Sequence, residues 1–327
     1  MLVTESGTAR ANPAAVPAPA TARQRRRRSW RRRGSEALWG YLLIAPTGIG
    51  LAVFYLWPVL QTAYFSFTEW GPFGGHEWTG LENYRTLAGD EEVLRALGNT
   101  ALYTLLGLAG IPVAIVFAAL LNRRRLRGVS VYRTLFFLPV VTMPVAVAMV
   151  WRWLYNGEYG LINYVLSLAG IDGPHWIADP ATALYALAAV GIWTTVGYNL
   201  VIFLAGMQAI PRQYYEAAAI DGAGPLAQFR KVTLPLLSPS IFFVSVISVI
   251  GSLQLFDLVY VIGGSGQSAR NNPAYPRIQT IVALFYDKAF YTNDRGYAAA
   301  IVMALLALIV VLTAVQFRLQ KRWVHYG

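Results

Sequence analysis

Residues 296–317 read GYAAAIVMALLALIVVLTAVQF, a run of 22 positions without a charged side chain. In a helix, about 18 to 20 apolar residues cross the roughly 30 Å of hydrocarbon in a bilayer. Uncharged runs near or above that length occur at 37–68, 96–122, 134–151, 180–211, 232–256 and 296–317. Because 56% of the 327 residues are hydrophobic and only 13% are charged, one soluble core could not hide this apolar surface. The chain is therefore expected to be a membrane protein.

The predicted architecture is all-α and polytopic, with six transmembrane helices at about 38–67, 99–121, 133–153, 181–207, 237–260 and 296–317. Residues 1–34 are rich in Ala, Pro and Arg and are expected to form a disordered basic cytoplasmic tail. Residues 35–327 are expected to form a single transmembrane domain. The connecting segments 68–97, 154–180 and 263–295 either only join helices or form a docking surface, which their aromatic content favours.

The distribution of charge predicts the orientation, because short basic loops stay on the cytoplasmic side of a membrane. With both termini inside, that side holds 20 of the 27 Lys and Arg residues, and the opposite loops hold 11 of the 16 acidic residues. The net charge of +11 is then largely a signal of topology. Nucleic-acid binding by the Arg-rich run 25–33 is the alternative, but that run directly precedes a membrane helix.

The predicted cytoplasmic loop 208–236 contains a short, rigidly ended helix. Pro211 is suited to a first helical turn, and Gly222 and Gly224 are suited to a left-handed stop, with Pro225 preventing continuation. The helix is expected to end near Asp221, and a second helix to begin around Leu226. A helical knob tied at both ends to membrane helices could transmit force.

The spacing of residues in this loop matches a known pattern. Glu216-Ala217-Ala218 is followed after three residues by Gly222, and after nine more by Val232-Thr233-Leu234-Pro235. This resembles the EAA loop of ABC-importer permeases, with Val232 in place of Ile as the only departure. Further phrases are similar to carbohydrate permeases of the maltose and glycerol-phosphate type, in the same order: 65–68, 80–84, 99–100, 138–139, 151–155, 160–163 and 203–206. The family usually has Gly-Gly-Pro and a shorter loop where this chain has Gly263-Gly264-Ser265-Gly266.

The resemblance implies the type I ABC importer permease fold and a subunit that carries a sugar, of the disaccharide or oligosaccharide class, across the bacterial plasma membrane. It implies four partners: a second permease subunit forming a heterodimer, an ATPase dimer, an extracytoplasmic sugar-binding protein and the bilayer. ATP and Mg would be bound by the ATPase chains. The resemblance assigns the coupling to the ATPase to eight residues of the loop: Tyr215, Glu216, Ala217, Ala218, Asp221, Gly222, Leu234 and Pro235.

A sugar pathway needs polar groups and aromatic faces inside the apolar bundle. Ser248 and Ser252 lie on one face of the helix at 237–260, with Gln254 toward its outer end, and Tyr198 and Asn199 lie in the helix at 181–207. Tyr198, Ser248 and Ser252 resemble cavity-lining positions of maltose-type permeases. The serines could instead hold helices together by close packing and hydrogen bonds.

No Gly-x-x-x-x-Gly-Lys-Ser/Thr loop occurs, and His76, His175 and His325 are scattered, so the chain is expected to have no catalytic site and no metal. The alternatives are a polytopic membrane enzyme acting on lipid-linked sugars and a stand-alone carrier. An enzyme of that kind should cluster its acidic residues at one membrane face, whereas those of this chain are dispersed. A stand-alone carrier would not need a capped cytoplasmic knob.

Overall fold

The computed structural model describes residues 39–70, 75–122 and 128–324. The predicted tail at 1–34 lies outside the described residues. The chain divides after Leu60 into two compact units, of which the second, Gln61–Gly327, holds nearly all of the elements described below. By length and composition, five of the described helices could each cross a membrane, and a bent pair of helices would be a sixth span.

The first candidate span is the helix Trp39–Phe65, which contains a π-helical turn, η1 (Ala52–Leu56), followed by α2 (Trp57–Phe65). A proline ring clashes with the carbonyl group four residues before it. Pro58 follows η1 by two positions, so the wider π-turn lies where the helix has to accommodate this ring. The predicted helix at 38–67 agrees with these bounds to within two residues.

The second span joins α4 (Glu91–Leu108) to α5 (Gly110–Leu121) and begins eight residues before the predicted start at 99. The carboxylate of Asp90 caps α4 by accepting a hydrogen bond of 2.7 Å from the Glu92 backbone N–H. Glu91, Glu92 and Arg95 in the first turns concealed this extension, because the uncharged run begins only after them.

The third predicted helix, 133–153, is two helices in the structure. α6 (Val129–Val141) and α7 (Pro144–Leu154) meet at an angle of 99°. Thr142 and Met143 have extended backbone ψ angles of 140° and 130°, and Pro144 begins α7. The residue before a proline is disfavoured in the helical region, so Met143 ends one helix and Pro144 starts the next. The prediction of one continuous helix was wrong.

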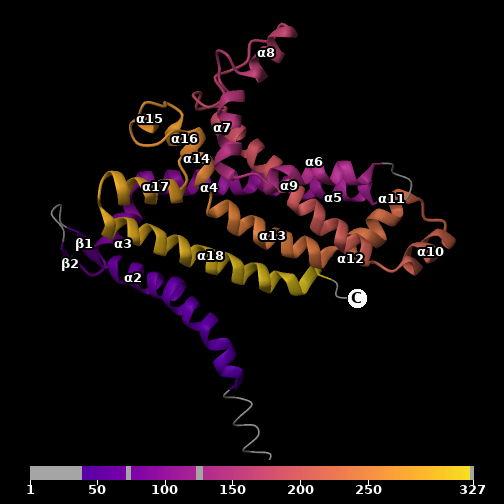
Figure 1. Ribbon diagram of the computed structural model, residues 1–327, viewed down its shortest axis with the longest axis horizontal. Coiled ribbons are helices and arrows are strands. Elements are labelled where there is room, and N and C mark those ends of the chain that lie inside the picture. The colour runs from indigo at the N-terminus through magenta and orange to yellow at the C-terminus, as the bar shows by residue number, and fades with distance from the viewer. Residues whose placement is uncertain (1–38, 71–74, 123–127, 325–327) are drawn as a thin grey trace, which may run out of the picture. The chain divides into compact units, whose positions relative to one another are not determined.

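The long helix α9 (Ala183–Ala209) packs against α4, α5, α6 and α13 (Ser238–Leu253), as Figure 1 shows. Gly197 lies at its crossing with α6, where a methyl group on Gly197 would collide with the backbone carbonyl of Phe136. The absence of a side chain at this position therefore sets how closely the two helices approach.

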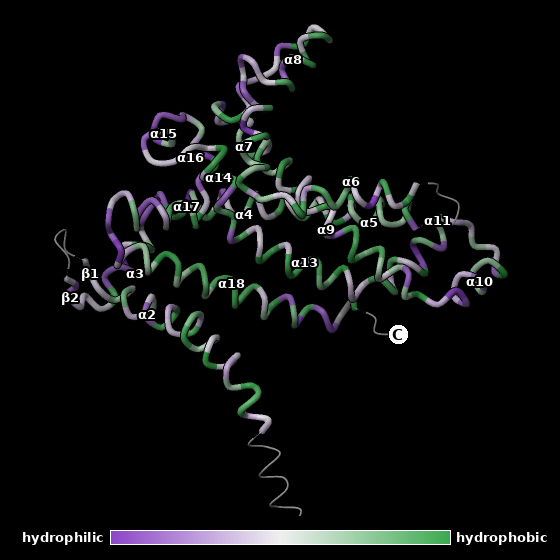
Figure 2. Tube along the Cα trace, in the orientation of Figure 1, coloured by the Kyte–Doolittle hydropathy of each residue, from purple (hydrophilic) through white to green (hydrophobic). Residues whose placement is uncertain are grey.

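The last span, α18 (Arg295–Trp323), packs against α13 and is hydrophobic through its centre and hydrophilic in its last turns (Figure 2). α13 continues after a short break into α14 (Asp257–Ile262), and together they form the candidate span Ser238–Ile262. Between α9 and α13 lie the short elements α10 (Arg212–Ile220), α11 (Pro225–Gln228), η2 (Phe229–Thr233) and α12 (Leu234–Leu236).

The three connecting segments contain elements of their own. The first holds the antiparallel strands β1 (Thr68–Trp70) and β2 (His76–Trp78) and helix α3 (Glu82–Gly89). The second holds α8 (Leu161–Leu168). The third holds four elements: α15 (Gln267–Arg270), α16 (Tyr275–Ile278), α17 (Ile281–Tyr286) and the π-helical turn η3 (Asp287–Tyr291).

An asparagine side chain stabilises each of these segments. The Nδ2 groups of Asn83, Asn163 and Asn272 donate hydrogen bonds of 3.0 to 3.3 Å to backbone carbonyls at least six residues away, and one of these bonds joins Asn272 to Ile177 in the second segment. Asn99 and Thr100 of α4 in turn hold the third segment, because Asn99 donates to the carbonyls of Pro276 and Gln279 and Thr100 accepts from the N–H of Ile281. The segments therefore present fixed surfaces.

Candidate functional site

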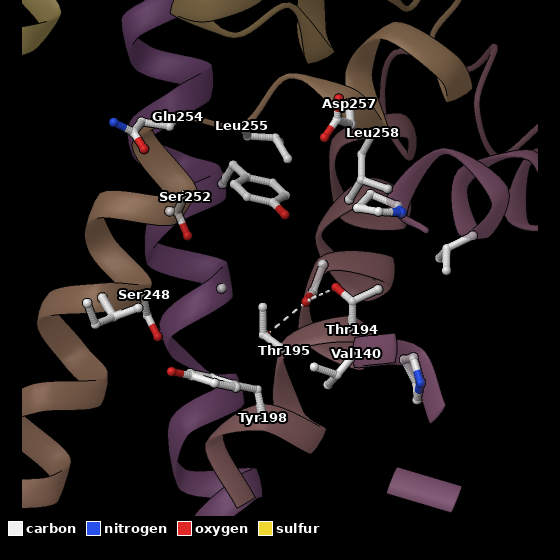
Figure 3. A pocket seen from close by; sticks show the side chains of 18 of the residues that line it. Val140, Thr194, Thr195, Tyr198, Ser248, Ser252, Gln254, Leu255, Asp257 and Leu258 are labelled. Atoms are coloured by element: carbon white, nitrogen blue, oxygen red, sulfur yellow. Dashed lines mark hydrogen bonds between the residues drawn. The ribbon is translucent and has the colours of Figure 1, made fainter. Parts of the chain in front are cut away.

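A cavity of about 450 Å³ lies between α4, α9, α13 and the bend of α6 and α7 (Figure 3). All five residues predicted for the substrate pathway line it: Tyr198, Asn199, Ser248, Ser252 and Gln254. They come from two helices that are separated in sequence by the whole segment from α10 to α12. The structure therefore brings the five together around one space.

Most polar groups that face the cavity are available to a ligand. Among the described residues, the side chains of Tyr198, Ser248, Ser252 and Gln254 have no hydrogen-bond partner. The hydroxyls of Thr194 and Thr195 are instead occupied, since both donate to the carbonyl of Gly191 at 2.8 and 2.9 Å. Unpaired polar groups at membrane depth are costly unless they face a water-filled or ligand-filled space. The alternative of serines that only join helices is therefore less favoured at positions 248 and 252.

A third of the cavity wall, seven of its 21 lining residues, lies on elements for which the sequence indicated no cavity. It comes from Tyr103 and Gly107 of α4 and from five residues at the bend of α6 and α7: Pro139, Val140, Thr142, Pro144 and Val147. Tyr103 is 5% exposed and looks in sequence like an ordinary core aromatic. The bend was missed, so nothing placed its residues at a cavity; the sequence Met-Pro at 143–144 was the available signal.

The electrostatics of the cavity are simple. Asp257, the first residue of α14, is its one charged lining residue in the described part of the chain, and no Lys, Arg or His lines it there. Apolar side chains and glycines make up most of the remaining wall. Nor does any group of three or more His, Cys, Asp or Glu among the described residues form a metal site. The cavity is therefore suited to an uncharged, hydroxyl-rich ligand.

The segment predicted for coupling forms a helix with a precise end. α10 carries Tyr215, Glu216, Ala217 and Ala218, and Asp221 is its C-cap. Gly222 has a φ angle of +79°, as the predicted left-handed stop requires. The N–H of Gly222 donates to the Ala219 carbonyl at 3.1 Å and the N–H of Ala223 to the Ala218 carbonyl at 2.9 Å. These two bonds form a Schellman motif, which fixes the exit of the chain from α10.

α11 begins at Pro225 and continues through η2 and α12 toward α13. Gly224, with φ of −68°, is not left-handed, so the predicted second left-handed position is wrong. Leu234 is partly buried against the core cluster at the C-terminal half of α9, and the carbonyl of Pro235 accepts a hydrogen bond of 2.6 Å from the Ser238 hydroxyl. These two residues therefore anchor the segment to α13.

α10 presents a largely exposed surface. Tyr214, Ala217 and Ile220, at spacings of three, lie on one side of it, and the Ile220 side chain is 87% exposed. Glu216 is also exposed and, among the described residues, has no ion-pair partner. It borders a groove of about 910 Å³ between α10, α11 and the end of α5. Exposed apolar side chains beside an unpaired carboxylate are typical of a docking surface.

The sequence and the fold both resemble those of known transport proteins. A family model described as "Binding-protein-dependent transport system inner membrane component" matches residues 110–325. The chain is 35% identical to the probable ABC transporter permease protein YesP of Bacillus subtilis (strain 168), over 89% of this chain and 93% of that protein. It is 34% identical to the sn-glycerol-3-phosphate transport system permease protein UgpA of Shigella flexneri, over 88% and 95% respectively.

Two solved structures share the fold. One is a bacterial ABC transporter involved in the import of the acidic polysaccharide alginate, with a TM-score of 0.78, 23% identity and coverage of 90% of this chain and 99% of that chain. The other is an alginate ABC transporter in complex with an alginate pentasaccharide-bound periplasmic protein, with a TM-score of 0.79, 22% identity and coverage of 91% and 99%. The family model matches more than half of this chain. The chain therefore belongs to the family of inner membrane components of binding-protein-dependent transport systems, as an ABC permease subunit.

Proposed function

We propose that this chain is the permease subunit of an ATP-driven importer for uncharged disaccharides or oligosaccharides. The observation that carries the proposal is the cavity between α4, α9 and α13. Its unpaired hydroxyl and amide groups, from Tyr198, Ser248, Ser252 and Gln254, can bond sugar hydroxyls, and its apolar wall can cover the faces of a sugar ring.

The charge on the cavity wall favours neutral sugars over sugar acids and sugar phosphates. A phosphate ester or a uronate in this cavity would meet Asp257 and no cationic side chain from the described residues. An anion taken from water without a partner costs several kcal/mol, roughly, even after relaxation of its surroundings. The relatives named for glycerol-3-phosphate and alginate carry anions, and the lining of this cavity favours a different cargo.

The topology follows from the basic loops. We take α6 and α7 as one broken span, which makes six, with both termini and α10 on the cytoplasmic side of a bacterial plasma membrane. Arg212, the first residue of α10, and Arg230 and Lys231, within η2, agree with that side. The three asparagine-stabilised segments then lie outside, where most acidic residues are.

The partners follow from the exposed surfaces. α10 would dock on one ATPase subunit of a dimer that binds ATP and Mg, with Glu216 facing a basic residue there. A second permease would complete the bundle, and a sugar-binding protein would deliver cargo to the outer segments. Closure of the ATPases would move α10 and rock the bundle between inward-facing and outward-facing states.

The test is transport by the assembled complex in proteoliposomes. Uptake is measured with maltose, cellobiose and their five-unit homologues, and with glycerol 3-phosphate and an alginate trisaccharide as anionic probes. The proposal expects ATP-dependent uptake of at least one neutral series and none of the anions. Uptake confined to the anionic probes would contradict it.

A further inference from the structure

Five aromatic side chains form a continuous cluster where α14, α17 and η3 meet. Tyr286 lies at its centre, with its ring centroid 4.9 Å from that of Phe256, 5.3 Å from Tyr260, 4.7 Å from Phe290 and 5.8 Å from Tyr291. We call these five residues the aromatic ridge. They come from two stretches of sequence, 256–260 and 286–291, so the fold and not the local sequence assembles them.

The ridge is accessible from outside the protein. The Phe290 side chain is 66% exposed and that of Tyr291 is 42% exposed, while Tyr260 and Tyr286 are partly exposed. Contiguous exposed aromatic rings are unfavourable in water unless something covers them. The three tyrosines of the ridge each have an apolar ring face and a hydroxyl that can form hydrogen bonds. A sugar ring likewise has an apolar face of C–H groups and an edge of hydroxyls, so the two surfaces are complementary.

The ridge continues directly from the cavity. Phe256 belongs to both, because it lines the cavity and contacts Tyr286. Asp257 and Gln254 lie at the same edge of the cavity, as Figure 3 shows. The Thr280 hydroxyl donates to the carbonyl of Leu255 at 2.8 Å and so fixes α17 beside this edge. A ligand leaving the cavity at this edge would pass over the ridge.

The ridge is also held rigidly. The carboxylate of Asp287, next to Tyr286, accepts hydrogen bonds from the Tyr275 hydroxyl at 2.7 Å and from the Gln279 amide at 2.9 Å. Lys288 forms an ion pair of 2.8 Å with Glu92 of α4, which ties η3 to the helix bundle. Rings that are already ordered lose little further entropy when they bind a ligand.

We propose that the aromatic ridge is a second sugar subsite, at the mouth of the cavity. This rests on the proposed function and extends it to chain length. One pyranose ring would stack on Tyr286 and Phe290, and the next units of the same chain would lie against Phe256 and inside the cavity. The ridge would therefore select oligosaccharides over monosaccharides and guide them inward end first.

The test uses the complete transport complex in proteoliposomes and series of malto-, cello- and xylo-oligosaccharides with one, two and five units. The Y286L/F290L variant keeps apolar bulk and removes the aromatic faces. Its half-saturating concentration for the pentasaccharide, which would span both ridge and cavity, should rise about tenfold, whereas the value for the disaccharide should rise less. Y286F and F290Y keep both faces and should retain the wild-type value. W78L removes another exposed aromatic side chain, outside the ridge, and is the matched control.

Each outcome decides something. If the wild-type complex transports no neutral sugar, the proposed function fails and this subsite with it. Transport by the wild type with no change in Y286L/F290L contradicts the subsite alone. An equal loss for all chain lengths, together with less second permease recovered on purification, would make the ridge a subunit contact. A lower amount of the Y286L/F290L variant in the membrane would indicate that the aromatic ridge instead lies at the membrane interface and anchors the protein there. Either result overturns the subsite.

Discussion

The phenolic oxygen of Tyr215 lies 3.0 Å from Oγ1 of Thr233, and this hydrogen bond joins α10 to η2 across 18 residues of sequence. Thr233 is buried, and its carbonyl accepts a bond from the N–H of Leu237 next to α13. The Gln228 side chain adds a second tie by donating to the Ala223 carbonyl at 3.0 Å. A movement of α10 would therefore be passed to α13, which forms one wall of the cavity.

The variant Y215F removes only the hydroxyl of this tie. A neutral hydrogen bond contributes about 1 kcal/mol, so α10 should stay folded but move more independently of η2. We expect fewer sugar molecules transported per ATP hydrolysed in proteoliposomes. Y164F is the control, since Tyr164 is exposed on α8, away from this tie. Equal ratios in the two variants would mean that the tie does not carry the coupling.

Gly222 and Gly224 provide a matched pair. A Cβ atom at either position would meet open space, but Gly222 has a φ of +79° and Gly224 a φ of −68°. G222A should therefore strain the end of α10 by about 1 to 2 kcal/mol, whereas G224A should not. The rate of ATP-dependent uptake should fall in G222A and remain near wild type in G224A. A loss of similar size in both variants would contradict this account of the loop.

Gly251 tests whether the cavity is the pathway. It lines the cavity, and a Cβ atom there would touch nothing within 4 Å, so G251L fills space without an initial clash. Uptake should fall by about tenfold or more while complex assembly is unchanged. G98L on α4 also points into open space and lies away from the cavity, so it should transport normally. Normal uptake by G251L would place the pathway elsewhere.

Tyr297 and Asp90 join the starts of α18 and α4 through a hydrogen bond of 2.6 Å. Burial alone would raise the pKa of Asp90, but the bonds from Tyr297 and from the Glu92 N–H, with the charge of Lys288, hold it below its ordinary 3.8. A carboxylate with a lowered pKa stabilises the fold above that ordinary value, and the contribution is lost as pH falls through the lowered one.

The variant Y297F loses the hydrogen bond to the Asp90 carboxylate, and a bond to a charged group contributes about 1.5 to 3 kcal/mol. Its thermal unfolding temperature in detergent at pH 7 should therefore be a few degrees lower than that of the wild type. The difference from wild type should narrow below about pH 4, since Asp90 is then protonated in both. Y164F, which alters an exposed tyrosine of α8, serves as the reference. A difference that stayed constant across pH would show that the Asp90 charge is not involved.

Much of the fold could be predicted, because hydrocarbon thickness imposes long uncharged runs. The helix expected at 181–207 is Ala183–Ala209, and that expected at 296–317 lies within Arg295–Trp323. The stop at Gly222 was predictable because few other residues adopt positive φ. The break at Pro144 was missed because proline is tolerated within membrane helices, so its presence alone does not distinguish a kink from a turn of 99°.

The candidate site was predictable only on the two helices that carry hydroxyls in apolar surroundings. Ser248 and Ser252 are conspicuous there, whereas Tyr103 and the wall at Val140 look like core residues. Tertiary packing decides which helix faces line the cavity, and the order of residues along the sequence does not show this packing directly. The aromatic ridge is the same case, since residues 256–260 and 286–291 meet only in the folded protein.

The central claim is that α10 transmits the work of ATP hydrolysis through Glu216. The direct measurement is ATP-dependent uptake by proteoliposomes containing the complete complex with E216A, compared with E158A, which removes an exposed carboxylate from the connecting segment 154–180. A charge-assisted contact contributes about 1.5 to 3 kcal/mol, so E216A should lower the rate of uptake by about ten- to a hundredfold while the permease remains in the membrane. Uptake at the wild-type rate in E216A would contradict the account.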